Sequence, residues 1–191
     1  MKSHVTHSLI AKSLMAATLV FAGQAMAVDE TPVPVVVDGG TVNFNGSVVT
    51  AACALGSNSA NIDVDMGQVR TASLATAGSE ASTSKSFSIV LEDCDSTVSK
   101  TAAVTFTGTA DATDTTSLAA GSNGGTGTAQ NVAIRLYDEK GTVVNLGEAS
   151  GATTLRNGEN TLNFSAKYYS PKGTATAGDA SAVATYTLTY L

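Results

Sequence analysis

The 191-residue chain is long enough for one domain with its own hydrophobic core, and 43% of its residues are hydrophobic. Acidic residues outnumber basic ones by 16 to 10, which gives a formal net charge of −6. Binding to nucleic acid depends on basic patches that displace counterions from phosphates, so this composition argues against a nucleic-acid partner.

Residues 1–27 have the organisation of a secretory signal peptide. Two lysines provide a positively charged start, an apolar run follows over residues 13–23, and Ala25 and Ala27 form a small-x-small cleavage pattern. The apolar run is shorter than the roughly 18 to 20 residues that a membrane-spanning helix needs. We therefore expect cleavage after Ala27 and export of a mature chain that begins at Val28.

Candidate catalytic and metal-binding residues are few. Both histidines, His4 and His7, lie in the expected signal peptide, so the mature chain would lack the imidazole of a Ser-His-Asp triad or a histidine-ligated metal site. Asp63 and Asp65 could suggest calcium binding or acid-base catalysis, but they alternate with apolar residues and are better explained as the solvated face of a strand. We expect no enzymatic activity, no cofactor and no small-molecule substrate.

The two cysteines, Cys53 and Cys94, are too far apart for a CxxC redox or zinc motif. In a secreted chain, an even pair indicates one structural disulfide. A crosslink that closes a loop of this length contributes about 3 to 4 kcal/mol in the chain-entropy model. The alternative, a reactive thiol, would have no histidine to activate it.

Strand-like alternation of apolar and polar residues runs through the rest of the chain, with almost no helical period. The alternating runs lie at residues 42–48, 87–91, 104–106, 132–136, 162–168 and 182–190. Glycine-rich and asparagine-rich connectors separate them, including the Gly121–Gly127 loop and the Asn157-Gly158 turn, and one short helical turn is expected within residues 69–77. About seven short strands and one disulfide predict an antiparallel β-sandwich of immunoglobulin-like type.

The segment ahead of the first cysteine allows two interpretations. Pro32 and Pro34 remove backbone donors and favour extended structure, and the alternating run at residues 42–48 follows them. Such an apolar arm could add a strand to the sheet edge of another molecule. It could equally be the first strand of its own domain.

Several segments, in this order, resemble a known family over nearly the whole mature chain. They are residues 40–49 with 51–53, residues 66–69, residues 91–94, residues 131–134, residues 160–164 and the ending 184–191. Together with a signal peptide, they make the sequence similar to the major subunits of type 1-like fimbriae, which are chaperone-usher pilins.

The resemblance implies an incomplete immunoglobulin-like sandwich that lacks its last strand and leaves a groove along the C-terminal strand. In this family, a periplasmic chaperone fills the groove first, and at the outer-membrane usher the N-terminal extension of the next subunit replaces it. Residues 28–48 would be that extension and residues 49–191 the pilin domain. The extension would insert one face of its strand, and Gly46 would enter a pocket too narrow for a Cβ atom. These donor residues are Val42, Phe44, Gly46 and Val48.

The resemblance also assigns a chaperone-facing C-terminal strand. Tyr190 matches the penultimate aromatic residue of the pilin C-terminal motif and Gly178 its glycine, while Tyr186 and Leu188 share the face of Tyr190. Leu191 departs from the polar residue expected last. The predicted function is a structural subunit that forms a homopolymer on the bacterial surface. A minor adaptor subunit of the same system, or a secreted self-contained binding domain, is the alternative.

Overall fold

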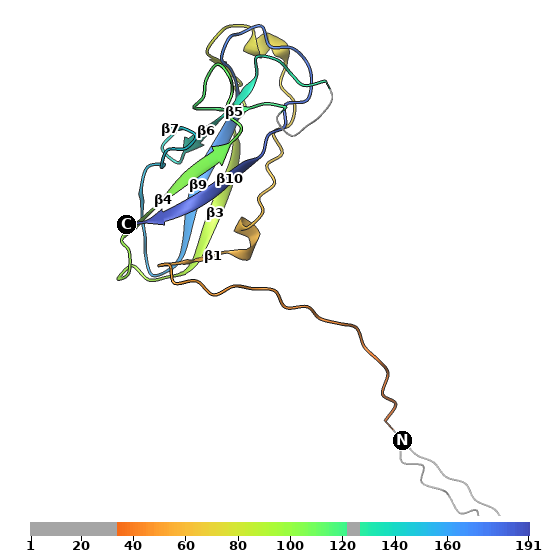
Figure 1. Ribbon diagram of the computed structural model, residues 1–191, viewed down its shortest axis with the longest axis vertical. Helices are drawn as coiled ribbons and strands as arrows, with labels where there is room; N and C mark the ends of the chain where they lie inside the picture. Colours follow the sequence, from red (N-terminus) through yellow and green to blue (C-terminus); the bar gives the residue numbers. More distant parts are fainter. Residues whose placement is uncertain (1–33, 122–126) are drawn as a thin grey trace, which may run out of the picture. The chain divides into compact units, whose positions relative to one another are not determined.

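The computed structural model describes residues 34–121 and 127–191, so the expected signal peptide, with Ala27, and most of the Gly121–Gly127 loop lie outside the described residues. The chain divides between Asn45 and Gly46 into two units, which are considered separately. In the first unit, residues 34–45 contain no helix or strand (Figure 1), and each of them is exposed. No described helix is long and apolar enough to cross a membrane.

The second unit is all-β and antiparallel, as the sequence predicts, and its strands form two sheets (Figure 1). The larger sheet has the order β1 (Ala54–Leu55), β3 (Lys85–Cys94), β9 (Gly158–Ser170), β6 (Ala133–Asp138) and β5 (Leu118–Ala119), with β2 (Ser79–Glu80) on β9 and β7 (Val143–Val144) on β6. The smaller sheet consists of β10 (Ala184–Tyr190), β4 (Thr101–Gly108) and β8 (Thr153–Thr154). Two 3₁₀ turns, η1 (Ser57–Ser59) and η2 (Thr71–Leu74), complete the described elements, and η2 falls within the residues predicted to form a helical turn.

The core lies where the apolar faces of the two sheets meet. Alternate residues of β3 and β9 are buried, which is the period of two that half-buried strands require. In β4 and β6, residues of both parities are buried, so these two strands are covered on both faces. Phe106 of β4 meets Phe164 of β9 edge-to-face with ring centroids 5.1 Å apart, and this contact joins the two sheets. The buried apolar side chains include Ile89, Leu91, Val104, Ile134, Leu136, Leu162 and Ala166.

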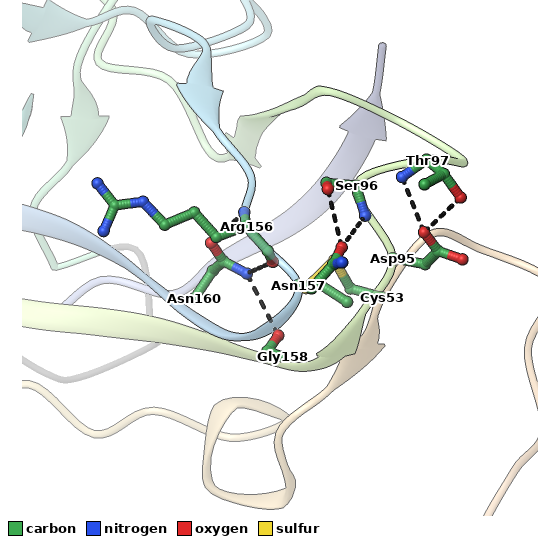
Figure 2. Close-up of a disulfide and its surroundings, with 9 residues drawn as sticks. Cys53, Asp95, Ser96, Thr97, Arg156, Asn157, Gly158 and Asn160 are labelled. Carbon is green, nitrogen blue, oxygen red and sulfur yellow. Dashed lines mark hydrogen bonds between the residues drawn. A yellow bond between two sulfur atoms is a disulfide. The ribbon is translucent and has the colours of Figure 1, made fainter.

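A disulfide joins Cys53 to Cys94, and both residues are buried. Cys53 directly precedes β1 and Cys94 ends β3, so the bond fixes the start of the sandwich to this end of the larger sheet (Figure 2). Nearby, the Asn157 side-chain oxygen accepts hydrogen bonds from both the backbone N–H and the hydroxyl of Ser96, each at 2.8 Å. Gly158 follows at φ 90°, a conformation that favours glycine and explains the predicted Asn157-Gly158 turn.

A polar network covers the outer face of the larger sheet. Arg135 of β6 lies 2.8 Å from the Asp114 carboxylate and 3.2 Å from that of Glu80, and its guanidinium lies 3.4 Å from the centre of the Tyr169 ring. The Tyr137 hydroxyl donates a hydrogen bond to Glu80 as well. These contacts hold β2 and the loop that contains Asp114 against β6 and β9.

This network predicts a pH-dependent contribution to stability. Burial raises the pKa of Asp114, but hydrogen bonds from Thr116, Arg135 and Ser117 outweigh burial and lower the pKa from 3.8 to about 2. Because the folded-state pKa is depressed, the stabilisation is present above pH 4 and is lost as the pH falls through about 2. Replacing Asp114 with asparagine should lower the free energy of unfolding by about 2 kcal/mol at pH 7 and by much less at pH 2.

Urea denaturation of the two proteins at pH 7, 4 and 2 would measure this difference. Asp63→Asn is the matched control, since Asp63 is exposed and takes part in none of the ion pairs of the described residues. An Asp114→Asn effect of the same size at pH 2 and pH 7 would contradict the assignment.

Candidate functional site

The last strand, β10, forms one wall of the candidate site. It pairs with β4 along its whole length, whereas its other edge has no strand partner among the described residues. Tyr186, Leu188 and Tyr190 are half-buried on the inner face of β10, and threonines alternate with them on the exposed outer face. Tyrosine phenols are uncharged at neutral pH, and burial raises the pKa of Tyr186 and Tyr190 further above its ordinary value. The inner face of β10 is therefore apolar and ends at an open sheet edge.

Residues 61–69 form the opposite wall. Ile62, Val64 and Met66 are half-buried, while the residues between them, including Asp63 and Asp65, are exposed, as the sequence predicts. The segment alternates like a strand, yet it belongs to no strand, because no neighbouring chain in the described region supplies a ladder for it. No group of three potential metal ligands exists among the described residues.

An open groove of about 1240 Å³ lies between these two walls. Both sheets contribute its apolar floor, which includes Phe87, Phe106, Leu118, Ile134, Leu136 and Ala166. At one end, the Tyr186 hydroxyl donates a hydrogen bond to the Ser59 carbonyl and so links β10 to the start of the opposite wall. Exposed apolar surface is unfavourable in water, and an unpaired sheet edge is a template for a further strand, so the groove has the properties of a sandwich that lacks one strand.

The predicted donor residues lie outside every described strand. Val42, Phe44 and Val48 are 72%, 92% and 101% exposed, and no atom lies within 4 Å of the position that a Cβ of Gly46 would take. Isolated exposed apolar residues are common on protein surfaces, but three on one face of an alternating segment are not. Residues 42–48 therefore present apolar side chains of one parity that have no partner among the described residues.

Gly178 lies elsewhere than predicted. It precedes β10 instead of belonging to it, and it lies in a bend against the backbone of residues 127–129. A Cβ at this position would lie only 2.3 Å from the Gly127 carbonyl oxygen and 2.4 Å from the Ala129 nitrogen, so this position has no room for a side chain. Glycine is required at position 178 because two loops approach each other closely here. The other three predicted residues, Tyr186, Leu188 and Tyr190, lie together on β10.

These features define the class of protein as an immunoglobulin-like sandwich with an open groove. Comparisons with known proteins identify the family within this class. The family model described as "Fimbrial protein" matches residues 42–191. The chain is 45% identical over 156 residues to the type-1 fimbrial protein A chain of Escherichia coli K12, covering 81% of this chain and 85% of that protein. It is 42% identical over 183 residues to the corresponding A chain of Salmonella typhi, covering 93% and 96%.

Solved structures agree with this relationship. A subunit from a chaperone-usher pilus structure that addresses rod uncoiling matches with a TM-score of 0.68 and 33% identity, over 83% of this chain and all of that one. The P pilus rod subunit PapA matches with a TM-score of 0.61 and 31% identity, over 74% of this chain and all of that one. The chain belongs to the fimbrial protein family, a family of structural subunits of extracellular fimbriae.

Proposed function

We propose that this fimbrial subunit polymerises by donor-strand exchange, in which residues 42–48 of one molecule fill the groove of the next. The observation that supports this most strongly is the pairing of two unsatisfied features in one chain. One is an apolar groove between two unpaired backbone edges, and the other is an exposed apolar strand face with no sheet of its own. The groove lacks a strand with an apolar face, and residues 42–48 lack a sheet to join.

The two features also match in length and pattern. The open strand β10 has seven residues, and Val42–Val48 is a run of the same length. A strand inserted beside β10 would direct alternate residues to the groove floor, and Val42, Phe44, Gly46 and Val48 share one parity. Backbone hydrogen bonds to β10 and to residues 61–69 would complete the ladder on both sides.

The free energy of such a joint is large. Burying one exposed valine or phenylalanine side chain contributes about 1.5 to 3 kcal/mol, so three of them contribute about 5 to 9 kcal/mol. Separation would require a whole strand to leave at once, and we therefore expect very slow dissociation. No nucleotide hydrolysis or catalytic residue is needed to keep the polymer together.

The position of groove and arm on the same chain determines the form of the assembly. A molecule that accepts an arm through one surface and donates its own through another makes a heterologous contact, which generates an open filament when the rotation does not close. A rod built from one kind of subunit follows directly. This is the expected architecture of a fimbrial shaft.

An unassembled subunit would need protection. An open sheet edge over an apolar groove promotes aggregation, and the inner face of β10, with Tyr186, Leu188 and Tyr190, is the surface that must be covered. We infer that a periplasmic chaperone covers this surface until an outer-membrane usher brings the donor arm of the next subunit. Membership of the fimbrial protein family supports the proposal of both partners.

Removal of the arm tests the proposal. Produced together with the periplasmic chaperone, mature subunits that lack residues 41–48 should accumulate as folded molecules and should form no oligomers that resist SDS, whereas the intact mature chain should form a ladder. Circular dichroism would check the fold and unboiled gels would count the oligomers. A normal ladder from the shortened protein would refute donor-strand exchange through this segment.

A further inference from the structure

The outer faces of the two groove walls differ in charge. The walls present short polar side chains to solvent, namely Thr185, Thr187 and Thr189 on β10 and Asn61, Asp63 and Asp65 on the opposite side. Asp63 and Asp65 take part in none of the ion pairs of the described residues. One wall of the groove therefore has an acidic outer edge, and the other is neutral.

Two cations and one further carboxylate lie near the groove walls. Lys85 Nζ lies 3.7 Å from the position that a Cβ at Gly67 would take, just beyond Asp65, and the exposed Arg70 follows the wall directly in the sequence. Asp179 precedes β10 on the other side of the groove, and burial raises the pKa of Tyr168 while the charges of Asp179 and Asp65 raise it further. Carboxylates from both sides of the groove thus act on the same buried tyrosine.

The donor segment is uncharged. No ionisable side chain occurs between Gly39 and Ile62 apart from the disulfide-bonded Cys53, and the outer parity of the proposed donor strand consists of Thr41, Asn43, Asn45 and Ser47. With the inner parity on the groove floor, these side chains would lie in cross-strand positions beside the outer face of residues 61–67. Directly opposite residues in paired strands have Cβ atoms about 4.5 to 5.5 Å apart, and like charges at that distance are destabilising.

We propose that Asp63 and Asp65 are specificity-determining residues of the groove, which reject donor strands with an acidic outer face and accept neutral or basic ones. The proposal rests on donor-strand exchange as the function of the groove. The partner that it selects is a neutral strand such as residues 41–47 of a second copy of this chain. The acidic wall excludes strands of equal hydrophobicity that carry glutamate or aspartate on the solvent side.

The test uses the mature chain in complex with the periplasmic chaperone, which keeps it monomeric, and synthetic peptides that span residues 39–50. The wild-type peptide carries a fluorophore, and unlabelled peptides compete for the groove at about 20 mM and 500 mM salt, where screening differs strongly. Three competitors carry glutamate, glutamine or lysine at both positions 43 and 45, and the glutamine peptide is the matched neutral control. The second acceptor is Asp63→Asn/Asp65→Asn, which keeps the oxygen that accepts a hydrogen bond from the Gly67 N–H at 2.9 Å.

At low salt, we expect the glutamate peptide to bind the wild-type acceptor about 3- to 10-fold more weakly than the glutamine peptide, and the lysine peptide more tightly. The difference should shrink at high salt and disappear with the Asp63→Asn/Asp65→Asn acceptor. Equal binding of the glutamate and glutamine peptides to the wild-type acceptor would overturn the role of Asp63 and Asp65 in specificity. The same would follow if the glutamate peptide bound the Asp63→Asn/Asp65→Asn acceptor more weakly than the glutamine peptide by an unchanged factor. Failure of the labelled wild-type peptide to bind at all would instead overturn donor-strand exchange itself, and the role of Asp63 and Asp65 in specificity with it.

Discussion

Replacing Gly46 with leucine should prevent the subunit from donating its arm while leaving the folded monomer unchanged. The monomer should tolerate the change, because no atom lies within 4 Å of a Cβ at this position. In the joint, the larger side chain would have to enter the groove of a neighbour, and overpacking costs about 1 to 3 kcal/mol or more. Unboiled gels of the Gly46→Leu subunit alone should show no SDS-resistant ladder. The melting temperature of the Gly46→Leu monomer should equal that of the wild-type monomer.

The matched control for this variant is Asn45→Leu, which places the same side chain on the adjacent residue of opposite parity. It should polymerise much like the wild-type protein, because residue 45 would face solvent in the joint. A ladder that is lost equally in both variants would show that parity, and therefore insertion of this strand face, does not determine assembly.

Replacing Leu188 with arginine should produce the complementary defect, a subunit that donates its arm but accepts none. Leu188 is half-buried on the groove side of β10, and an unpaired charge there would have to be buried under an incoming strand. Thr187→Arg is the matched control, because Thr187 lies next to Leu188 on the exposed face. Thr187→Arg subunits should form a ladder and Leu188→Arg subunits should not.

A mixture of Gly46→Leu and Leu188→Arg subunits tests whether one arm pairs with one groove. Gly46→Leu molecules retain an intact groove and Leu188→Arg molecules retain an intact arm, so the mixture should form SDS-resistant dimers and nothing larger. A mixture without dimers, or one that restores the full ladder, would contradict a one-to-one pairing of arm and groove.

The position of the long strands was predictable, because the runs that contain Ile89, Val104, Ile134 and Phe164 became β3, β4, β6 and β9. Burial follows the predicted parity in β3 and β9, whereas β4 and β6 bury residues of both parities, which the alternation did not indicate. The Arg135 network was not predictable, since its partners Glu80 and Asp114 lie 55 and 21 positions away in the sequence. Only the folded sheet brings them together.

The groove was predictable only through the family resemblance. Alternation in β10 indicates that Tyr186 and Leu188 face inward, but it does not say that one edge of the strand lacks a partner. The same limit applies to residues 61–69, which have a strand pattern and no ladder. Gly178 was wrongly assigned to the last strand, because its sequence position gives no information about the close approach of residues 127–129.

The most direct test of the central claim is intermolecular crosslinking between the arm and the groove. One subunit would carry Phe44→Cys and a second would carry Leu188→Cys, while the native cysteines stay unreactive in their buried disulfide. If residues 42–48 of one molecule fill the groove of the next, oxidation of the assembled mixture should give covalent dimers, and each variant alone should give none between these two positions. No dimers from a mixture that has visibly polymerised, or a Phe44→Cys/Leu188→Cys double variant that crosslinks only within single molecules, would contradict the account.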